Sequence, residues 1–523
     1  MITIIISNIK IYENISDEEV FKYACKKTKI NISNVEEWNI VKKSVDARDK
    51  NDVHFSYSFD VLMKGEKREP KEDLLLVKDK TKLNKKPVVV GAGPAGLFAA
   101  YTLALNGYNP ILLEQGKCIE DREKDVEDFI NNRKLNTKSN IQFGEGGAGT
   151  FSDGKLTTNI NADLNKTVLE TFVRFGAPKE IMYLSKPHIG TDNLRIVVKN
   201  MREEIIRLGG EVRFNTKVVD FELSSGVVPA PHVISVVLDS GDKIETDNVI
   251  LAIGHSARDT FEKLYEKNVQ IEPKPFSVGV RIEHKQSIIN ESQYGTKTKL
   301  NLPPAEYKLA YHGDDGRSCY TFCMCPGGFV MASSSEEGTI VTNGMSYYNR
   351  DGENANSALL VNIMPEDYLK EHNDHPLSGM YFQKDLEEKA FKMAGGNYNA
   401  PAQRLGDYIK EDLKDSNQDV NPTYKPGVTY CNLKELFPDF INKILKDGIK
   451  YFGTKLYLFN DKNAVMTAVE SRSSSPIKII RDDYMNSSIK GIHPCGEGAG
   501  YAGGIMTAAM DGIKVAKTIV TKM

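Results

Sequence analysis

The sequence has few cysteines for its length, which argues against a fold built on disulfides. Seven cysteines occur in 523 residues, and an odd number of this size does not form a disulfide framework. Free thiols at this frequency suit a reducing compartment, so we expect a cytoplasmic protein.

Long apolar runs are also missing, and we do not expect a secretory leader. No stretch of 18 apolar residues occurs, which predicts that no segment spans a membrane. Residues 1–6 are apolar, but no basic residues flank them, and Asn8 and Lys10 cut the run short. This start does not resemble a secretory signal.

The chain has almost no excess charge of either sign. It carries 68 Lys and Arg residues against 71 Asp and Glu residues, a net charge of -3. That balance argues against bulk binding to nucleic acid or to a membrane, so we expect a small-molecule substrate, and the oligomeric state stays open. Internal repeats and low-complexity tracts are absent, and the length predicts two or three domains.

One strong nucleotide-binding signature is present between residues 87 and 116. Residues 87–90 are an apolar run of strand length, and a glycine-rich turn follows them at residues 91–96. A stretch rich in Ala and Leu comes next, and then a second apolar run ends in Glu114. A strand, glycine turn, helix, strand and acid in about 30 residues make one βαβ unit.

Each part of this unit has a physical role in binding a dinucleotide. Gly91 allows the tight turn, Gly93 lets the backbone approach a pyrophosphate, and Gly96 lets the helix pack close to the strand. The helix N-terminus offers free N–H groups to the phosphates. Glu114, 23 residues after Gly91, is placed to accept hydrogen bonds from an unphosphorylated ribose. We therefore expect FAD or NAD rather than NADP; a purely structural glycine turn is the alternative.

A second glycine-rich stretch covers residues 142–155. Its glycine content is incompatible with a stable helix or strand interior. Backbone N–H groups of such a loop can converge on an anion or lie against a ring, and Gly146, Gly147 and Thr150 are our candidates there. The alternative is a flexible surface loop. Lys155 ends the stretch and is a candidate catalytic residue.

The remaining chain divides into further units. Residues 1–63 show a β-α-β-β order, which predicts a small ferredoxin-like or split α/β module, either an accessory or lid domain or a second substrate or partner site. Residues 64–86 read as a charged, solvated linker. The FAD-binding domain covers residues 87–271 and, after an insert, residues 451–523. Residues 272–450 alternate like an antiparallel sheet with later helices, and predict an inserted α+β substrate domain.

Two motifs outside the first unit are further candidates. Cys323 and Cys325 form a Cys-x-Cys before Pro-Gly-Gly. This predicts either a redox or nucleophilic thiol on a turn, for which Cys325 is our catalytic candidate, or two buried small residues. Zinc is disfavoured because no second Cys or His pair follows at finger spacing. The glycine-rich stretch at residues 491–504 contains His493, a further catalytic candidate, and Glu497, and it leads into a helix whose dipole favours negative charge at its start.

These motifs together resemble the two-dinucleotide-binding-domain flavoproteins. The similarity rests on residues 91–96, 142–155, 252–258, 323–328 and 491–504, and it is greatest to uncharacterised bacterial FAD-dependent, NAD-utilising dehydrogenases. It implies that Gly254 adjoins the cofactor and that the backbone of Val218 pairs with adenine. It also implies that Glu497 binds the ribityl chain or pyrophosphate, although that fold often uses Asp there.

The expected fold is α/β, with a discontinuous Rossmann-like FAD-binding domain. The expected function is an FAD-dependent oxidoreductase, a dehydrogenase or reductase, with NAD(P)H as a candidate transient electron donor and no resident metal. The alternatives are a flavin-binding redox sensor or assembly partner without turnover, or a flavoprotein acting on RNA or an isoprenoid lipid. The candidate cofactor-binding residues are Gly91, Gly93, Pro94, Ala95, Gly96, Glu114, Gly146, Gly147, Thr150, Val218, Gly254, Glu497, Gly498, Gly503, Gly504 and Ile505.

Overall fold

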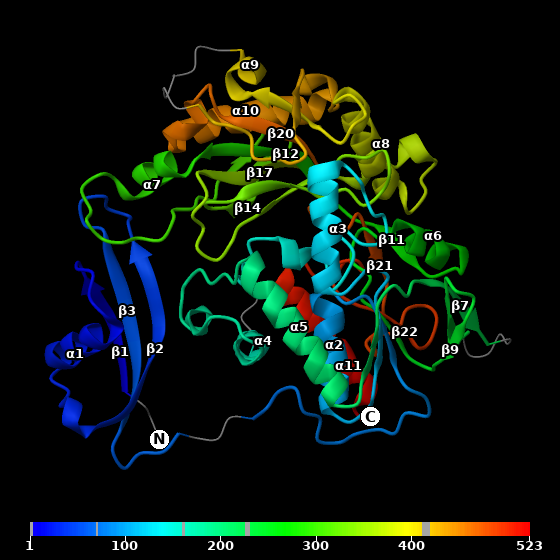
Figure 1. The fold of residues 1–523 in the computed structure, drawn as a ribbon, viewed down its shortest axis with the longest axis horizontal. Helices are drawn as coiled ribbons and strands as arrows, with labels where there is room; N and C mark the ends of the chain where they lie inside the picture. The colour runs from blue at the N-terminus through cyan, green and yellow to red at the C-terminus, as the bar shows by residue number, and fades with distance from the viewer. Residues whose placement is uncertain (1–3, 69–71, 159–162, 225–230, 411–418, 523) are drawn as a thin grey trace.

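The chain builds three units: an N-terminal unit, a central unit, and a unit inserted into the central one. The structure is a computed structural model and describes residues 4–68, 72–158, 163–224, 231–410 and 419–522. Figure 1 shows the N-terminal unit at the left, a unit with a parallel sheet at the lower centre, and an inserted unit above it. The C-terminus returns to the central unit.

The N-terminal unit is a three-stranded antiparallel sheet covered by one helix. Its elements are β1 (Ile4–Ile11), α1 (Asp17–Thr28), β2 (Val35–Asp46) and β3 (His54–Met63), with strand order β1-β3-β2. Ser16 caps α1 in a capping box with Glu19, and Phe21 stacks on Trp38 at 4.4 Å between ring centroids. The β-α-β-β order matches the sequence pattern. Residues 4–63 contain neither the second helix nor the fourth strand of a full ferredoxin-like unit.

The central unit contains a five-stranded parallel sheet. Its strands, in spatial order, are β22 (Ile492–Pro494), β10 (Val249–Leu251), β4 (Val88–Val90), β5 (Ile111–Leu113) and β6 (Glu211–Arg213). All but β6 are buried along their whole length. Short apolar runs of this kind are typical of a sheet covered on both faces, so the Rossmann-like prediction is confirmed.

Helices cover one face of this sheet and a meander covers the other. Alternate side chains such as Val89 and Leu112 pack against α2 (Pro94–Leu105), α5 (Thr191–Arg207) and α11 (Ile505–Val520). Their neighbours pack against β7 (Val218–Leu223) and β8 (Val233–Leu238), which form a meander with β9 (Lys243–Glu245). The two helices α2 and α11 approach closely, because a Cβ at Gly512 would lie 2.1 Å from the Ala95 carbonyl oxygen.

The inserted unit is a seven-stranded, mostly antiparallel sheet. Its spatial order is β13 (Ala310–His312), β14 (Ser318–Cys325), β17 (Asn354–Ile363), β12 (Phe276–Lys285), β20 (Val465–Glu470), β18 (Ala400–Arg404) and β19 (Val428–Tyr430). Helices α8 (Ser378–Met393) and α10 (Asp439–Lys455) pack on it. This agrees with the antiparallel prediction. The sheet extends past residue 450, because β20 lies between β12 and β18.

The other elements connect these layers. They are α3 (Ile119–Asn132), α4 (Asp163–Arg174), α6 (Arg258–Glu266), α7 (Gln286–Tyr294), α9 (Leu405–Ile409), β11 (Ile271–Pro273), β15 (Phe329–Ala332), β16 (Thr342–Met345) and β21 (Ile477–Ile479).

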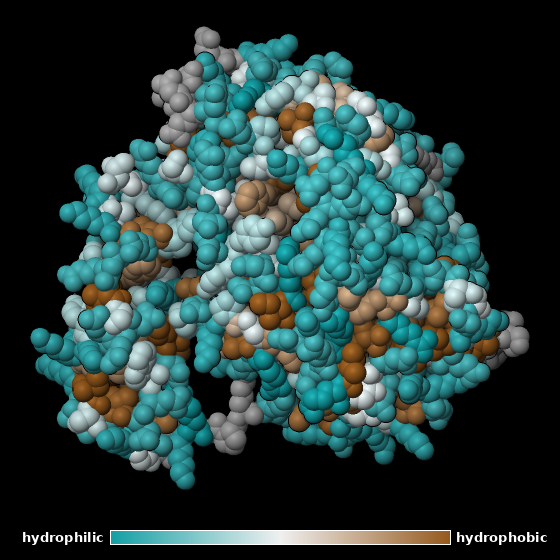
Figure 2. Space-filling view, viewed as in Figure 1, coloured by the Kyte–Doolittle hydropathy of each residue, from teal (hydrophilic) through white to brown (hydrophobic). Residues whose placement is uncertain are grey.

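The surface is mainly hydrophilic on the face drawn in Figure 2, with apolar groups over the N-terminal unit at the left and over the central unit at the lower centre and right. Ile4, Ile5, Tyr12 and Ile32 are among the exposed large apolar residues of the N-terminal unit. Over the described residues, no helix combines the length and apolar character needed to cross a membrane.

Candidate functional site

A cavity of about 740 Å³ opens where the strands β4, β5 and β10 end, under the inserted sheet. This volume falls in the range of small-molecule and cofactor sites, and the carboxyl ends of parallel strands are where such folds bind ligands. Most of the predicted cofactor-binding residues line it, namely Gly91, Gly93, Pro94, Ala95, Glu114, Gly147, Val218, Gly254, Glu497, Gly503, Gly504 and Ile505.

The glycine turn at the end of β4 aims the start of α2 into the cavity. Gly91 has φ +99°, and a Cβ there would lie 2.4 Å from the Ala252 carbonyl oxygen. Gly93 is the N-cap of α2 and Pro94 is its first residue, and no side chain caps the helix. The free N–H groups at this end are therefore available to a ligand, and the helix dipole makes them suited to an anion.

Four predicted residues shape the cavity from behind rather than line it: Gly96, Gly146, Thr150 and Gly498. A Cβ added at Gly96 would lie 1.8 Å from the Gly91 carbonyl oxygen. One added at Gly146 would lie 1.9 Å from Thr150 Oγ1, and one added at Gly498 would lie 2.2 Å from the Gly254 carbonyl oxygen. Thr150 itself is buried. These glycines allow the loops of the cavity wall to touch.

Glu114 organises the cavity end beyond β5. Its Oε1 accepts hydrogen bonds from the backbone N–H groups of Gly116 and Gly144, both at 2.9 Å, and its Oε2 accepts one from Ala92 at 2.8 Å. A carboxylate has about four acceptor positions. One position of Glu114 therefore remains for a ribose hydroxyl. Of the other three, two join the two glycine-rich loops through Ala92 and Gly144, and one binds Gly116.

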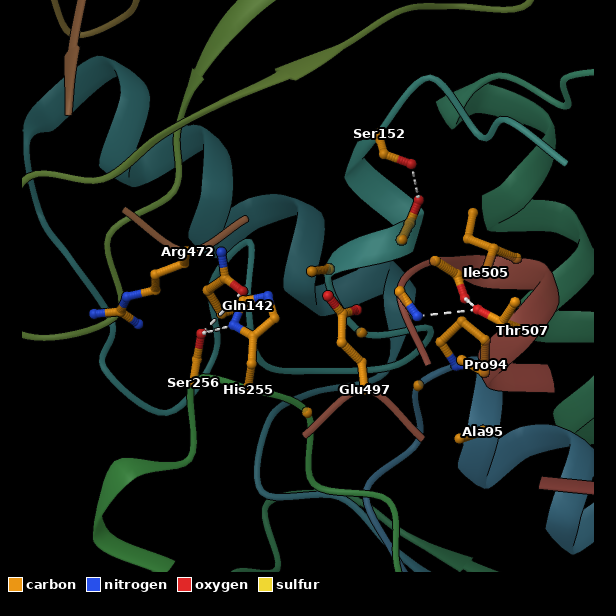
Figure 3. A pocket seen from close by; sticks show the side chains of 18 of the residues that line it. Pro94, Ala95, Gln142, Ser152, His255, Ser256, Arg472, Glu497, Ile505 and Thr507 are labelled. Carbon is orange, nitrogen blue, oxygen red and sulfur yellow. Dashed lines mark hydrogen bonds between the residues drawn. The ribbon is translucent and has the colours of Figure 1, made fainter. Parts of the chain in front are cut away.

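The C-terminal glycine stretch brings a second helix start into the same cavity. Gly504 is the N-cap of α11, which has no side-chain cap. No atom lies within 4 Å of a Cβ built at Gly503 or Gly504. Glu497 points into the cavity in Figure 3, and burial raises the pKa of its carboxyl to about 7, partly offset by Lys274.

Charged residues from two units meet at the end of the cavity under the inserted sheet. Lys155 contacts Glu306 at 3.1 Å and donates a hydrogen bond to the Met324 carbonyl oxygen. Lys186 pairs with the same Glu306 at 2.8 Å. Burial alone would lower the pKa of Lys155, but Glu306 and Asp153 raise it, so this ammonium stays charged.

The structure does not place two catalytic candidates, His493 and Cys325, on the cavity wall. His493 lies in β22, where its ring nitrogens meet the Met485 carbonyl oxygen at 3.2 Å and Asn248 Oδ1 at 3.1 Å. Burial lowers the pKa of His493 to about 4, so it is a neutral, satisfied core histidine. Cys325 is fully buried, and Cys323 reaches the cavity instead. A strand that alternated regularly would present both on one face, but a bulge separates them.

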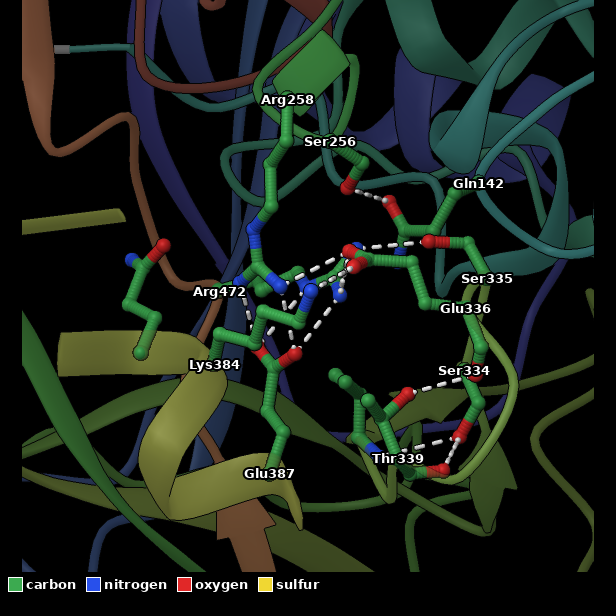
Figure 4. Close-up of polar contacts among 12 residues, drawn as sticks. Gln142, Ser256, Arg258, Ser334, Ser335, Glu336, Thr339, Lys384, Glu387 and Arg472 are labelled. Atoms are coloured by element: carbon green, nitrogen blue, oxygen red, sulfur yellow. Dashed lines mark hydrogen bonds and ion pairs between the residues drawn. The ribbon is translucent and has the colours of Figure 1, made fainter. Parts of the chain in front are cut away.

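A cluster of charged side chains, which the sequence patterns do not predict, lies at another wall of the cavity. Arg258 and Arg472 hold Glu387 from both sides, at 2.8 and 2.7 Å, and both also bind Glu336 (Figure 4). Burial alone would raise the pKa of Glu387, but the two arginines lower it to about 2. Arg472 lines the cavity close to His255. No spacing pattern links Arg258, Glu336, Glu387 and Arg472, because they come from four distant segments of the chain.

Gln142 and Ser256 continue this wall. Ser256 Oγ donates to Gln142 Oε1 at 3.1 Å, and the Gln142 amide donates to Ser333 Oγ at 2.7 Å. Burial and Arg472 lower the pKa of His255 to about 4, so its ring is neutral.

Over the described residues, no group of His, Cys, Asp and Glu could hold a metal ion, and all seven cysteines are free.

Comparison with known proteins agrees with this geometry. Residues 85–260 match the pyridine nucleotide-disulphide oxidoreductase family, and residues 275–473 match the C-terminal domain-like family of FAD-dependent proteins. Residues 1–62 match a domain of unknown function. An uncharacterized protein of Clostridium beijerinckii is 45% identical over 517 residues, covering 96% of this chain and 95% of its own.

Solved structures show weaker similarity. CtdE, determined in complex with FAD, is 13% identical with a TM-score of 0.33, covering 83% of each chain. The flavin-dependent brominase Bmp2 is 12% identical with a TM-score of 0.35, covering 83% of this chain and 77% of its own. At these scores neither protein informs the chemistry of this chain.

Proposed function

Since the chain belongs to the FAD-dependent pyridine nucleotide-disulphide oxidoreductase family, we propose that it is a dehydrogenase or reductase of a small molecule. FAD, when bound, supplies the hydride or electron chemistry. The observation that carries the proposal is that two uncapped helix starts, those of α2 and α11, face one cavity whose far end holds Glu114.

The residues fit FAD from end to end. The start of α2 suits the pyrophosphate, and Glu114 with Val218 suits the adenosine half. Gly503 and Gly504 leave room for a ring beside the start of α11. The N–H groups at the start of α11 would favour negative charge on such a ring.

The substrate then enters under the inserted sheet. Lys155, Glu306 and Lys186 lie at this end, and the Lys155 ammonium can hold a substrate oxygen or move a proton. The described residues of the insert form an antiparallel sheet rather than a second parallel nucleotide-binding sheet. NAD(P)H, the proposed electron donor, would therefore use the same opening as the substrate.

Purification followed by anaerobic reduction tests the proposal. We expect a yellow protein that releases FAD, not FMN, on denaturation, and whose visible absorbance bleaches with NADH or NADPH. Repeated turnover with an electron acceptor supports an oxidoreductase. A flavin that bleaches once and passes no electrons on would instead indicate a redox sensor. A colourless protein that FAD cannot reconstitute would exclude both.

A further inference from the structure

Arg350, at the cavity wall, has one edge of its guanidinium held by a carboxylate and the other edge free. Its Nε donates to Asp153 Oδ1 at 2.9 Å, and its Nη2 donates to Asp153 Oδ2 at 2.5 Å. Both residues are buried, yet Arg350 lines the cavity. Over the described residues, its Nη1 makes no hydrogen bond and is not sealed from solvent. The Nη1 edge of Arg350 is therefore available to a ligand in the cavity.

The fold also fixes the backbone of Arg350. This residue has φ +51°, a left-handed conformation that a residue with a long side chain rarely adopts. The turn after β14 packs against it: a Cβ at Gly327 would lie 1.8 Å from the Arg350 carbonyl oxygen, and the Gly352 N–H group donates to the Gly327 carbonyl oxygen at 3.0 Å. The Pro-Gly-Gly turn at residues 326–328 therefore holds Arg350 in place.

Lys155 brings a second cation to this part of the cavity. Its Nζ pairs with Glu306 at 3.1 Å and donates a hydrogen bond to the Met324 carbonyl oxygen. An ammonium has three N–H donors, so one donor of Lys155 remains for a ligand.

His188 connects the two cations. Its backbone pairs with that of Lys155, and its Nε2 lies 2.9 Å from the carbonyl oxygen of Tyr348, two residues before Arg350. Burial lowers the pKa of the His188 ring, and Arg350 and Lys155 lower it further, whereas Asp153 opposes them. One ring therefore lies within the electrostatic reach of both cations, which places Arg350 and Lys155 in the same part of the cavity.

Cations outnumber carboxylates at this end of the cavity. Three basic side chains share two carboxylates in ion pairs, namely Arg350, Lys155 and Lys186 with Asp153 and Glu306. Lys308 adds an exposed ammonium to the wall. The carboxyl of Glu470, which also lines the cavity, is paired with Arg281, and that of Glu497 is partly offset by Lys274. An anion bound at this end would meet an excess of positive charge.

We propose that Arg350 and Lys155 form a carboxylate-binding site, so that the substrate of this oxidoreductase carries a carboxylate group. The free edge of Arg350 presents parallel N–H groups on Nη1 and Nη2, and this fork matches the two oxygens of a carboxylate. The remaining donor of Lys155 binds one of the same oxygens. The inference rests on the proposed function, because it names the substrate class of the same cavity.

Isothermal titration calorimetry of the full-length protein with benzoate and benzamide tests the site. The two probes have nearly the same shape, and only benzoate carries a carboxylate. At constant ionic strength we expect benzoate to bind at least about tenfold more tightly than benzamide, since charge-assisted hydrogen bonds are the stronger ones. Inorganic phosphate is the third probe. Phosphate that binds more tightly than benzoate would overturn the carboxylate assignment and indicate a site for the phosphates of a nucleotide.

Two variants locate the binding. Arg350→Lys keeps a positive charge beside Asp153 but lacks the second N–H edge, so it should weaken benzoate binding by about tenfold or more. Lys155→Met removes the other donor and should have a similar effect, while Lys186 still pairs with Glu306. The affinity for benzamide should change less than about twofold in both variants, since the neutral amide makes no charge-assisted pair with either side chain.

Arg317→Lys is the matched control. Arg317 Nη1 and Nη2 bind Asp367 at 2.8 and 2.5 Å, also in a paired arrangement, but Arg317 does not line the cavity. Its affinity for benzoate should equal that of the wild type. Circular dichroism shows whether each variant has folded; if Arg350→Lys does not fold, Lys155→Met and the comparison of probes on the wild type decide.

Either of two results overturns the proposal: equal affinities of the wild type for benzoate and benzamide, or benzoate binding that neither Arg350→Lys nor Lys155→Met weakens. Calorimetry reads binding of the probe whether or not the protein retains FAD. Such a failure therefore differs from failure of the proposed function, which shows as absent FAD or absent reduction.

Discussion

Glu114 illustrates how one side chain both builds the cavity and can bind its ligand. Two of its acceptor positions join the two glycine-rich loops, a third binds the Gly116 N–H group, and a fourth remains for a ligand. We expect Glu114→Gln to weaken FAD binding on the order of tenfold to a hundredfold, since a charge-assisted hydrogen bond is lost. Fluorescence titration of the apoprotein with FAD measures this. Glu127→Ala, on the exposed side of α3, is the matched control; equal affinities for the two variants would reject the role of Glu114.

Glu497 gives a pH dependence with a defined sign. Burial raises the pKa of its carboxyl to about 7 in the folded protein, above the ordinary value of about 4.3. The folded state therefore binds this proton more tightly than the unfolded state does. Protonation of Glu497 contributes to the free energy of unfolding below the ordinary pKa, and the contribution is lost as the pH rises through 7. Glu497→Gln should gain Tm relative to the wild type, on the order of 1–2 °C, between pH 5 and 8 in the apoproteins. A constant Tm difference across this range would contradict the shift.

The start of α11 is the element whose local structure predicts an effect on the affinity and reduction potential of a bound flavin. Gly504 is extended, with φ 160°, and the space beside it is open. Gly504→Val would place a branched side chain where a ring must approach, so we expect weaker FAD binding. Protein that retains FAD should show a lower reduction potential, because a helix start stabilises the reduced anion by about 0.3–2 kcal/mol.

Redox titration distinguishes this role from simple packing of α11. Thr518→Val, near the other end of the helix and only half-buried, changes the helix without touching the cavity, and the potential of its bound FAD should equal that of the wild type. If Gly504→Val lowers the Tm but leaves the potential of bound FAD unchanged, the helix only supports the sheet.

The elements that the sequence predicted correctly are those whose local structure follows from the spacing of nearby residues. The turn at Gly91 and Gly93, the acid at Glu114 and the helix after Gly504 all follow from short-range patterns, and the structure brings them to one cavity. That Cys323 rather than Cys325 lines the cavity does not follow from the sequence, because a bulge changes the period-two alternation of β14 and no residue pattern predicts that bulge. The location of His493 away from the cavity also does not follow from the sequence, because the tertiary fold supplies its partners Asn248 and Met485.

At the scale of the whole molecule, the inserted unit is joined to the central one through the buried cluster around Glu387. This carboxylate lies on α8 of the insert, whereas Arg258 begins α6 of the central unit and Arg472 follows β20. Glu387→Ala would leave two buried guanidinium groups without their main partner. Breaking such a buried pair costs about 3–5 kcal/mol, so we expect a clear loss of Tm.

The location of the cluster predicts more than lower stability. Because Arg472 and the neighbouring His255 line the cavity, loosening the contact between the units should also raise hydrogen exchange in residues 252–258 and reduce the FAD retained on purification. Glu388→Ala is the matched control, since its exposed side chain lies one residue further along the same helix and pairs with Lys392 at 3.9 Å. If Glu387→Ala lowered the Tm while hydrogen exchange in residues 252–258 and FAD content matched those of Glu388→Ala, the cluster would stabilise the insert alone. A change in all three measurements would mean that the charge cluster holds the two units together around the cofactor.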